Sequence, residues 1–298
     1  MTNLATLTRV RMQLALRNKM FFFFSVVMPL GFFFLYAGVF AKSDPHAVSF
    51  FLGPVLALNV MGSFWGLSAT LVMYREQGIL RRFHVAPVSS ADMLASSVLA
   101  NFVLTLPTVL VILALARFAF HVQNFGNLPA LVLFVCVGTV AFGSLGLVVA
   151  SITNTMQETQ VINQILWLPL IFLSGATMPL AYLPKVVQGF SNYLPATYLV
   201  TGLQQATFFS KHITDLWVYF LALVAWAVLS FFVASQLFRW EPETKVPKNG
   251  KLWAAATVIP FLVLGIWLHG NGKMLAEAQA AYTAISRSSA PAADQPKN

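Results

Sequence analysis

The chain has 298 residues, of which 58% are hydrophobic and only 9% are charged. A soluble domain carries about 25% charged residues, so this composition excludes an ordinary globular protein and indicates that lipid covers most of the surface. The basic residues behind the net charge of +9 lie in short tracts between apolar runs, which is typical of loops at an anionic membrane face and argues against nucleic-acid binding.

Residues 1–19 form a basic, amphipathic segment. Apolar residues recur in it with helical spacing at Leu4, Leu7, Val10 and Leu14. This pattern predicts a helix that lies in the cytoplasmic membrane interface, and a short solvated leader is the alternative. The apolar run that follows is about 22 residues long, which is too long for a signal-peptide core, so we interpret it as a retained first span.

A bilayer core needs about 20 mostly apolar residues per helix. Six runs meet this length: Met20–Ala41, Phe50–Met73, Leu94–Phe118, Leu128–Ile152, Val161–Leu180 and Leu216–Phe238. A seventh run, Leu252–His269, is shorter and contains Pro260, yet it stays within the range that can span. The sequence therefore predicts an all-α polytopic membrane protein, with six spans over residues 20–240 and an extra C-terminal hydrophobic segment and flexible tail over residues 241–298.

The distribution of Lys and Arg predicts the orientation. With the N-terminus in the cytoplasm, the inner segments carry Arg9, Arg11, Arg17, Lys19, Arg75, Arg81, Arg82, Arg239, Lys245, Lys248 and Lys251. The outer loops then carry only Lys42, Arg117, Lys185 and Lys211. This bias satisfies the positive-inside rule and predicts a multi-pass protein of the cell (inner) membrane with a cytoplasmic N-terminus. The tail after Gly270 would lie outside if the seventh run spans.

The segment Tyr74–Asp92 lies between the second and third spans. Apolar anchors alternate in it with charges of both signs, at Glu76, Leu80, Arg81, Arg82 and Phe83. Pro87 should end any helix that precedes it. A solvated loop has no need of apolar anchors, so we expect a short amphipathic helix at the membrane face that can receive a partner.

A second unusual segment, Thr177–Ser210, lies between the fifth and sixth spans. Pro184 and Pro195 each precede a short stretch with helical spacing, and proline is favoured at the first position of a helix. The segment is too apolar for a solvated loop and too interrupted for a span. It therefore predicts two short helices that dip into the outer leaflet, where their backbone must pack against protein.

The chain lacks the residues that several kinds of chemistry need. Its five His are scattered without a carboxylate cluster, no nucleophile motif is present, and Cys136 is the only cysteine, so neither a catalytic nor a metal site is expected. Gly250-Lys251 is followed by Leu252 where a phosphate-binding loop has Ser or Thr. Any ATP and Mg²⁺ would therefore be bound by another chain.

Proton-coupled transporters need ionisable groups inside the membrane. Here Asp92, Glu158 and Asp215 lie at span ends, and the first six runs have no ionisable residue in mid-span. Proton-coupled efflux by a secondary transporter remains the alternative, because groups near span ends can line a path. The polar residues that are candidates for such a path are Asn59, Ser63, Asn163 and Gln164, although hydrogen bonding between helices is the more ordinary role of such residues.

Two strings of residues resemble those of permease subunits of ATP-binding-cassette (ABC) transporters, type-2 exporter family, over residues 1–240. The string after the second span resembles that family's charged coupling segment, at Glu76, Gly78, Leu80, Arg81, Arg82 and Pro87. The string after the fifth span resembles its outer re-entrant signature, at Phe172, Leu173, Ser174, Gly175, Pro179, Leu183, Pro184, Leu194, Pro195 and Tyr198.

The resemblance implies a six-helix exporter domain that pairs with a second permease copy or paralogue. Each half would engage one cytoplasmic ATPase subunit through the coupling segment, with the turn near Glu158 as a second contact. It implies ATP-driven export by alternating access, and we expect a hydrophobic or amphipathic cargo, drug-like or lipid-like. The seventh run departs from the family, whose members usually end after six spans.

Overall fold

The structure, a computed structural model, describes residues 8–9, 12–13, 27–40, 44–84, 89–241 and 249–271. All regular structure in these residues is helical. The helices are α3 (Met28–Leu35, continued by a π-helical turn to Phe40), α4 (Pro45–Met61), α5 (Ser63–Glu76), α6 (Ile79–His84), α7 (Ser90–Phe118), α8 (Leu128–Ile152), α9 (Met156–Leu173), η3 (Leu180–Tyr182), α10 (Lys185–Ser191), α11 (Pro195–Thr207), α12 (Trp217–Leu237), α13 (Gly250–Ala256) and α14 (Ile259–Asn271).

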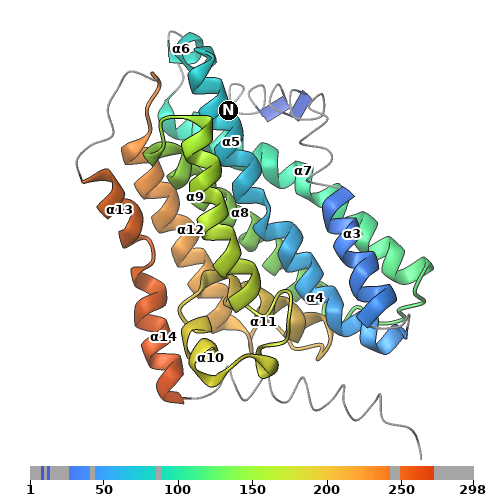
Figure 1. Cartoon of the computed structure of the whole chain (residues 1–298). Coiled ribbons are helices and arrows are strands. Elements are labelled where there is room, and N and C mark those ends of the chain that lie inside the picture. Colours follow the sequence, from blue (N-terminus) through green and yellow to red (C-terminus); the bar gives the residue numbers. More distant parts are fainter. Residues whose placement is uncertain are drawn as a thin grey trace, which may run out of the picture.

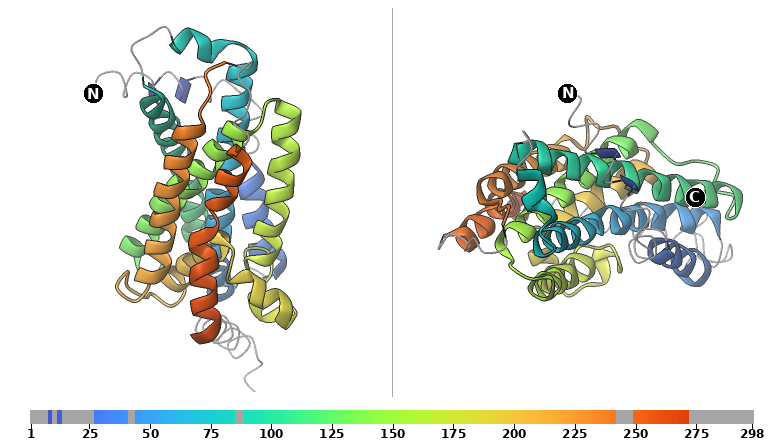
Figure 2. Two further views of the ribbon diagram at one scale, coloured as in Figure 1. Left: turned by 90° about the vertical axis from the view of Figure 1, so that its left-hand side faces the viewer. Right: turned by 90° about the horizontal axis from the view of Figure 1, so that it is seen from above.

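The long helices run between two ends of an elongated bundle (Figures 1 and 2). One end holds α6, the turn between α8 and α9, and the last turn of α12, and we name it the α6 end. The opposite end holds α10 and the start of α4, and we name it the α10 end. The two segments that stood out in the sequence, Tyr74–Asp92 and Thr177–Ser210, therefore lie at opposite ends.

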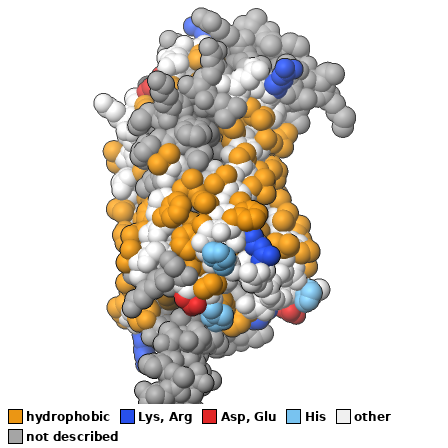
Figure 3. Space-filling model, turned by 90° about the vertical axis from the view of Figure 1, so that its right-hand side faces the viewer, with side chains coloured by type: hydrophobic (Ala, Val, Ile, Leu, Met, Phe, Trp, Pro, Cys, Tyr) orange, Lys and Arg blue, Asp and Glu red, His pale blue; other side chains and the backbone are white. Residues whose placement is uncertain are grey.

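Among the residues that the structure describes, four helical stretches are long and apolar enough to cross a membrane, by length and composition: Pro45–Glu76, Ser90–Phe118, Leu128–Ile152 and Trp217–Leu237. Pro29–Val39 and Leu252–Ile266 are shorter apolar helices. Hydrophobic side chains form a broad band across the face in Figure 3, with Lys or Arg near its top and charged and His side chains in its lower half. The protein is therefore an all-α, multi-pass membrane protein, as predicted.

The fifth predicted run, Val161–Leu180, differs from the helix found there. α9 begins at Met156, because Thr155 caps it by accepting a hydrogen bond from the Glu158 backbone N–H at 3.2 Å. It ends at Leu173, because Gly175 takes a left-handed conformation with φ of +88°. Hydropathy marks the apolar part of a helix and not its polar first turn, which explains the shift.

The core of the bundle surrounds α8, which packs against α4, α5, α7, α11 and α12. α8 approaches α5 closely at Gly146, where an added Cβ would lie 2.5 Å from the Phe64 carbonyl oxygen. Phe134 and Phe142 of α8 are fully buried, and Phe142 meets Trp226 of α12 edge to face with centroids 5.1 Å apart. Close helix contacts through small residues and interlocking aromatics are typical of membrane bundles.

The predicted seventh run is present as two helices rather than one. α13 starts near the α6 end and α14 finishes at the α10 end, with a break at Thr257–Val258 just before Pro260 (Figures 1 and 2). Pro260 lacks an amide hydrogen, which favours such a break. Most of the predicted interfacial helix at residues 1–19, the start of the first span and the tail after Asn271 lie outside the described residues.

Candidate functional site

The candidate site begins where α5 ends. The Gly78 backbone N–H donates to the Arg75 carbonyl at 3.0 Å, and Gly78 itself has φ of +69°. A residue with a side chain rarely adopts this conformation, so glycine here lets the chain turn sharply into α6. α6 is six residues long, Ile79–His84, and ends before Pro87, which lies outside the described residues. The short helix predicted from the sequence is therefore present.

Leu80 anchors α6 to the bundle. Its side chain is fully buried in a small cluster with Tyr74 of α5 and Met93 of α7. Phe238 and Trp240, just after α12, pack against the same cluster. Leu80 thus anchors α6 to residues of α5 and α7, beside the segment that follows α12. The side chain of Phe83, the second predicted anchor, lies outside the described residues, as does that of Arg82.

The charged residues of α6 and α5 differ in their surroundings. Arg81 is 71% exposed and its Nε lies 3.8 Å from a carboxylate oxygen of Glu241, a distance at which an exposed pair contributes about 0–1 kcal/mol. Glu76, at the last position of α5, instead accepts a hydrogen bond from the Met156 backbone N–H at 2.9 Å. The Glu76 carboxylate, placed beside the first backbone N–H of α9, stabilises the start of that helix.

Glu158 lies at the same helix start. Its carboxylate accepts from the Asn154 backbone N–H at 2.8 Å, while Thr155 caps α9. The structure therefore brings Glu76 and Glu158 together at the turn between α8 and α9, although they are far apart in the sequence. Both had been predicted as contact points for the same partner.

Two buried arginines donate hydrogen bonds to the carbonyls at the end of α8. From the sequence alone, they had been counted only as positive charges on the inner side. Arg75 is 2% exposed and donates to the carbonyls of Ala150, at 2.9 Å, and Thr153. Arg239, just after α12, is 7% exposed and donates to the carbonyls of Ser151, at 3.2 Å, and Thr153, at 2.7 Å. Cations at a helix C-terminus satisfy carbonyls that the helix leaves unpaired.

This pair ties three helices together at the α6 end. Arg75 comes from α5 and Arg239 from the end of α12, and both reach the Thr153 carbonyl after α8. Arg239 also donates to the Asn154 side chain at 2.9 Å. Burial lowers the pKa of Arg239, an effect that the nearby Glu158 carboxylate opposes. A guanidinium nevertheless stays protonated in proteins, so both residues bring permanent positive charge to this end.

The four path candidates do not share one environment. Asn163 is fully buried and exchanges hydrogen bonds with Ser68 of α5, at 2.8 and 3.2 Å. It thus joins α9 to α5, which is the ordinary interhelical role. Asn59 and Ser63 are 7% exposed, and the Asn59 Oδ1 and Ser63 Oγ atoms have no hydrogen-bond partner among the described residues. Gln164 is exposed on another face of α9.

At the α10 end, the two predicted short helices are present. Pro184 immediately precedes α10 and Pro195 is the first residue of α11, as proposed from their sequence context. Tyr198 of α11 is fully buried, and its hydroxyl donates to the Asn192 carbonyl just after α10, at 2.9 Å. α10 and α11 are therefore linked to each other by this hydrogen bond as well as by the chain.

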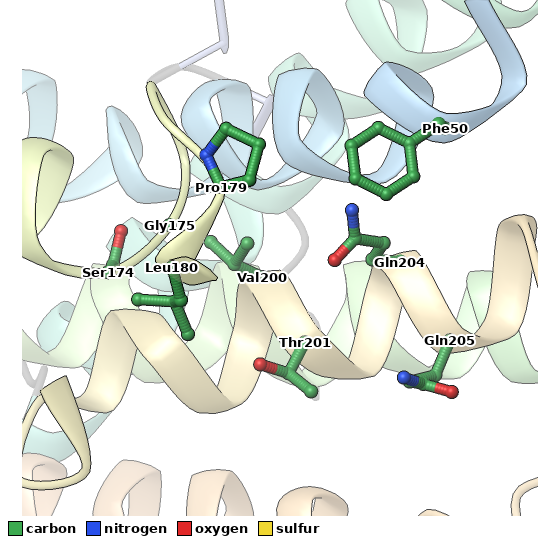
Figure 4. Close-up of a pocket in the computed structure, with 9 residues that line it drawn as sticks. All are labelled: Phe50, Ser174, Gly175, Pro179, Leu180, Val200, Thr201, Gln204 and Gln205. Carbon is green, nitrogen blue, oxygen red and sulfur yellow. The ribbon is translucent and has the colours of Figure 1, made fainter. Parts of the chain in front are cut away.

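A small cavity lies at this end, between α4, the connection from α9 to α10, and α11 (Figure 4). Its lining consists of Phe50, Ser174, Gly175, Pro179, Leu180, Val200, Thr201, Gln204 and Gln205. Three predicted gate residues, Ser174, Gly175 and Pro179, meet here. In the part of the chain that the structure describes, no three His, Cys, Asp or Glu residues are placed to hold a metal ion.

A sequence profile of the family described as "ABC-2 type transporter" matches residues 2–208. This range covers the described residues from α3 to the end of α11, and so includes both the α6 segment and the two short helices of the α10 end. α12, α13 and α14 lie beyond it.

Several curated proteins are similar to the chain. The linearmycin resistance permease protein LnrN of Bacillus subtilis is 25% identical over 61% of this chain and 47% of its own length. The putative transport permease YvfS of the same organism is 22% identical over 78% of this chain and 95% of its own length. The ABC transporter G family member 20 of Dictyostelium discoideum is 28% identical over 56% of this chain, and the match spans only 23% of that protein.

Proposed function

Because the chain belongs to the ABC-2 type transporter family, we propose that it is the permease subunit of an ATP-driven exporter whose ATPase is a separate polypeptide. The observation that carries this proposal is the α6 end. There a six-residue helix with exposed charge packs against residues of α5, of α7 and of the segment just after α12, beside the capped start of α9. A helix anchored in this way can transmit a movement of a partner outside the membrane to the transmembrane helices.

The α6 end suits a partner with charge of both signs. Arg81 is exposed and its pairing with Glu241 is weak, so a carboxylate of a partner protein can take the place of Glu241 beside Arg81 at little cost. Glu76, Glu158 and Arg239 bond backbone groups at the turn between α8 and α9, and this fixes the geometry that a partner meets. We propose that the cytoplasmic ATPase binds here, with ATP and Mg²⁺ held on that subunit.

A second permease copy or paralogue would complete the path. Gln157, Gln160 and Gln164 recur at helical spacing on α9 and are all exposed. Gln164 is eight residues beyond Met156, the first residue of α9. Because a helix rises about 1.5 Å per residue, Gln164 lies about 12 Å along α9 from its start. An amide that faces hydrocarbon without a partner is costly. We propose that this glutamine face of α9 borders the other half and the route of the cargo, rather than lipid.

For the cargo we propose a hydrophobic or amphipathic small molecule that leaves the cytoplasm. The name of the LnrN relative refers to linearmycin resistance, which supports efflux as the direction of transport without naming a substrate for this chain. The main alternative is proton-coupled efflux without ATP. The carboxylates of Glu76, Asp92 and Glu158 lie at helix ends in the structure. Those of Glu76 and Glu158 accept from backbone N–H groups and that of Asp92 accepts from the Ser89 hydroxyl, which disfavours a relay through the membrane.

The driving force can be tested in everted membrane vesicles that contain the chain and its co-purifying ATPase. An amphipathic fluorescent dye should accumulate inside the vesicles when ATP is added, and accumulation should persist after an ionophore collapses the proton gradient. Accumulation that needs the gradient but not ATP hydrolysis would establish the proton-coupled alternative. Vesicles without the chain give the background.

A further inference from the structure

The C-terminal helix pair lies outside the residues that match the family, yet it packs on the part of the chain that does. We propose that α14 is a built-in brace that positions α10 and α11, with Phe261 and Gly265 as the positioning residues. The proposal rests on the proposed function only in treating these two short helices as a moving part of the exporter. Figure 2 shows α14 running down the bundle towards α10.

Phe261 supplies the first contact. Its side chain is fully buried, and its ring centroid lies 5.0 Å from that of Tyr198 in α11 and 5.4 Å from that of Trp226 in α12. These separations fall in the range in which aromatic pairs attract. Phe261 therefore fills the space between α11 and α12, and α11 cannot shift at this level without opening a void beside Tyr198.

Gly265 supplies the second contact, one helical turn further on. An added Cβ at this residue would lie 2.4 Å from Cδ1 of Tyr193, which stands in the turn between α10 and α11. Residues four apart share one face of a helix, so Phe261 and Gly265 present a single surface to the two short helices. Only glycine lets α14 approach Tyr193 this closely.

The opposite face of α14 explains what keeps it in place. Leu262, Val263 and Ile266 are 46%, 63% and 67% exposed, and all are apolar. In a membrane this face lies in lipid, which offers no hydrophobic force to hold α14, so the close packing of Phe261 and Gly265 on the other face positions the helix. The brace then reaches α10 through one chain of contacts: Phe261 packs on Tyr198, and the Tyr198 hydroxyl bonds the Asn192 carbonyl after α10.

Thiol labelling tests the brace on the protein alone, without ATP, ATPase or cargo. The reporter is Ser191→Cys in a Cys136→Ala background, because Ser191 of α10 is 1% exposed. A second reporter, Ser96→Cys, sits at the α6 end and is fully buried. Two variants, Phe261→Ala and Gly265→Leu, disturb the brace. Phe261→Leu is the conservative variant. Leu262→Ala, on the lipid side of α14, is the matched control. Labelling by a polar maleimide is measured in nanodiscs, where both ends are accessible.

We expect Phe261→Ala and Gly265→Leu each to speed labelling of the Ser191→Cys reporter about tenfold or more, because labelling follows the population of locally open protein. Phe261→Leu should recover most of the protection, and Leu262→Ala should leave it unchanged. The Ser96→Cys reporter should stay protected in every variant. Unchanged labelling at Ser191→Cys, or an equal rise at both reporters, would overturn the proposal. Either result leaves the permease assignment intact, and a failed dye assay would leave the labelling result standing.

Discussion

The two ends of the bundle are held together by different physics. At the α6 end, Arg75, Arg239, Glu76 and Glu158 bond backbone groups at the turn between α8 and α9. At the α10 end, the contacts described above are close and uncharged. The Tyr198 hydroxyl bonds the Asn192 carbonyl, and an added Cβ on Gly53 of α4 would lie 2.7 Å from the backbone of Gln204 in α11. The helices are thus held together by charged side chains at the α6 end and by close packing of uncharged groups at the α10 end.

This difference matches what each end is proposed to do. Charged and hydrogen-bonded groups near water can exchange partners, so a separate ATPase can engage the α6 end and move it. Close packing has no such alternative partners, so the helices of the α10 end can separate only by moving as rigid bodies. The variants below break or sharpen this contrast, and their stability is best measured as the free energy of unfolding by SDS titration in mixed micelles.

The largest effect is expected from removing a buried arginine at the α6 end. Arg75→Met should lower the free energy of unfolding by about 3 kcal/mol. It leaves the buried Ala150 carbonyl unpaired, which costs about 1–3 kcal/mol, and it removes one of the two charged donors to the Thr153 carbonyl, which keeps its bond from Arg239. Arg81→Met, at a side chain that is 71% exposed, is the control and should change stability by less than about 0.5 kcal/mol. Equal effects of the two would refute the idea that Arg75 closes the end of α8.

A smaller loss is expected from disturbing the fit at the α10 end. Gly53→Ala should destabilise the protein by about 2 kcal/mol, because overpacking of a tight contact typically costs about 1–3 kcal/mol. Gly31→Ala in α3 is the matched control, since nothing lies within 4 Å of its added Cβ. It should be neutral or slightly stabilising, because alanine favours a helix over glycine. If the control lost as much as Gly53→Ala, the close approach of α4 to α11 would not be what limits this site.

A third variant tests the helix cap that joins α5 to α9. Glu76→Ala should cost about 1 kcal/mol, because it removes both the bond to the Met156 amide and a negative charge at the start of a helix. Glu76→Gln keeps an acceptor but not the charge, so its loss should be smaller. High salt should reduce the difference between the two variants. A difference that salt does not change would mean that the charge contributes nothing at this cap.

Much of the fold can be predicted from hydropathy, and part of the site can be predicted from residues that favour the ends of helices. The run Leu128–Ile152 has the same bounds in the sequence prediction and in the structure. Pro184 and Pro195 marked two helix starts, and both are found. The start of α9 was misplaced because Thr155 and Glu158 are polar, although their spacing is that of a helix cap.

The arginine pair could not be predicted in this way. Arg75 and Arg239 are 164 positions apart in the chain and meet through backbone carbonyls, which carry no sequence signature. The separation of Asn163 from Gln164 was predictable, because adjacent residues on a helix point about 100° apart. Asn163 faces Ser68 of α5 and Gln164 is exposed, so the two path candidates of α9 lie on different faces of the helix.

The central claim is that a separate ATPase drives this permease through the α6 segment. The most direct measurement compares Arg81→Glu/Arg82→Glu with Lys185→Glu/Lys211→Glu, which makes the same charge change at the α10 end. We expect the first variant to keep its stability but to lose its co-purifying ATPase and ATP-driven dye accumulation. The two new carboxylates would repel the acidic residues of the ATPase that the arginines are proposed to meet, and like charges across an interface cost several kcal/mol. The second should keep both. If the Arg81→Glu/Arg82→Glu variant retains ATPase and transports dye at the wild-type rate, the claim is wrong.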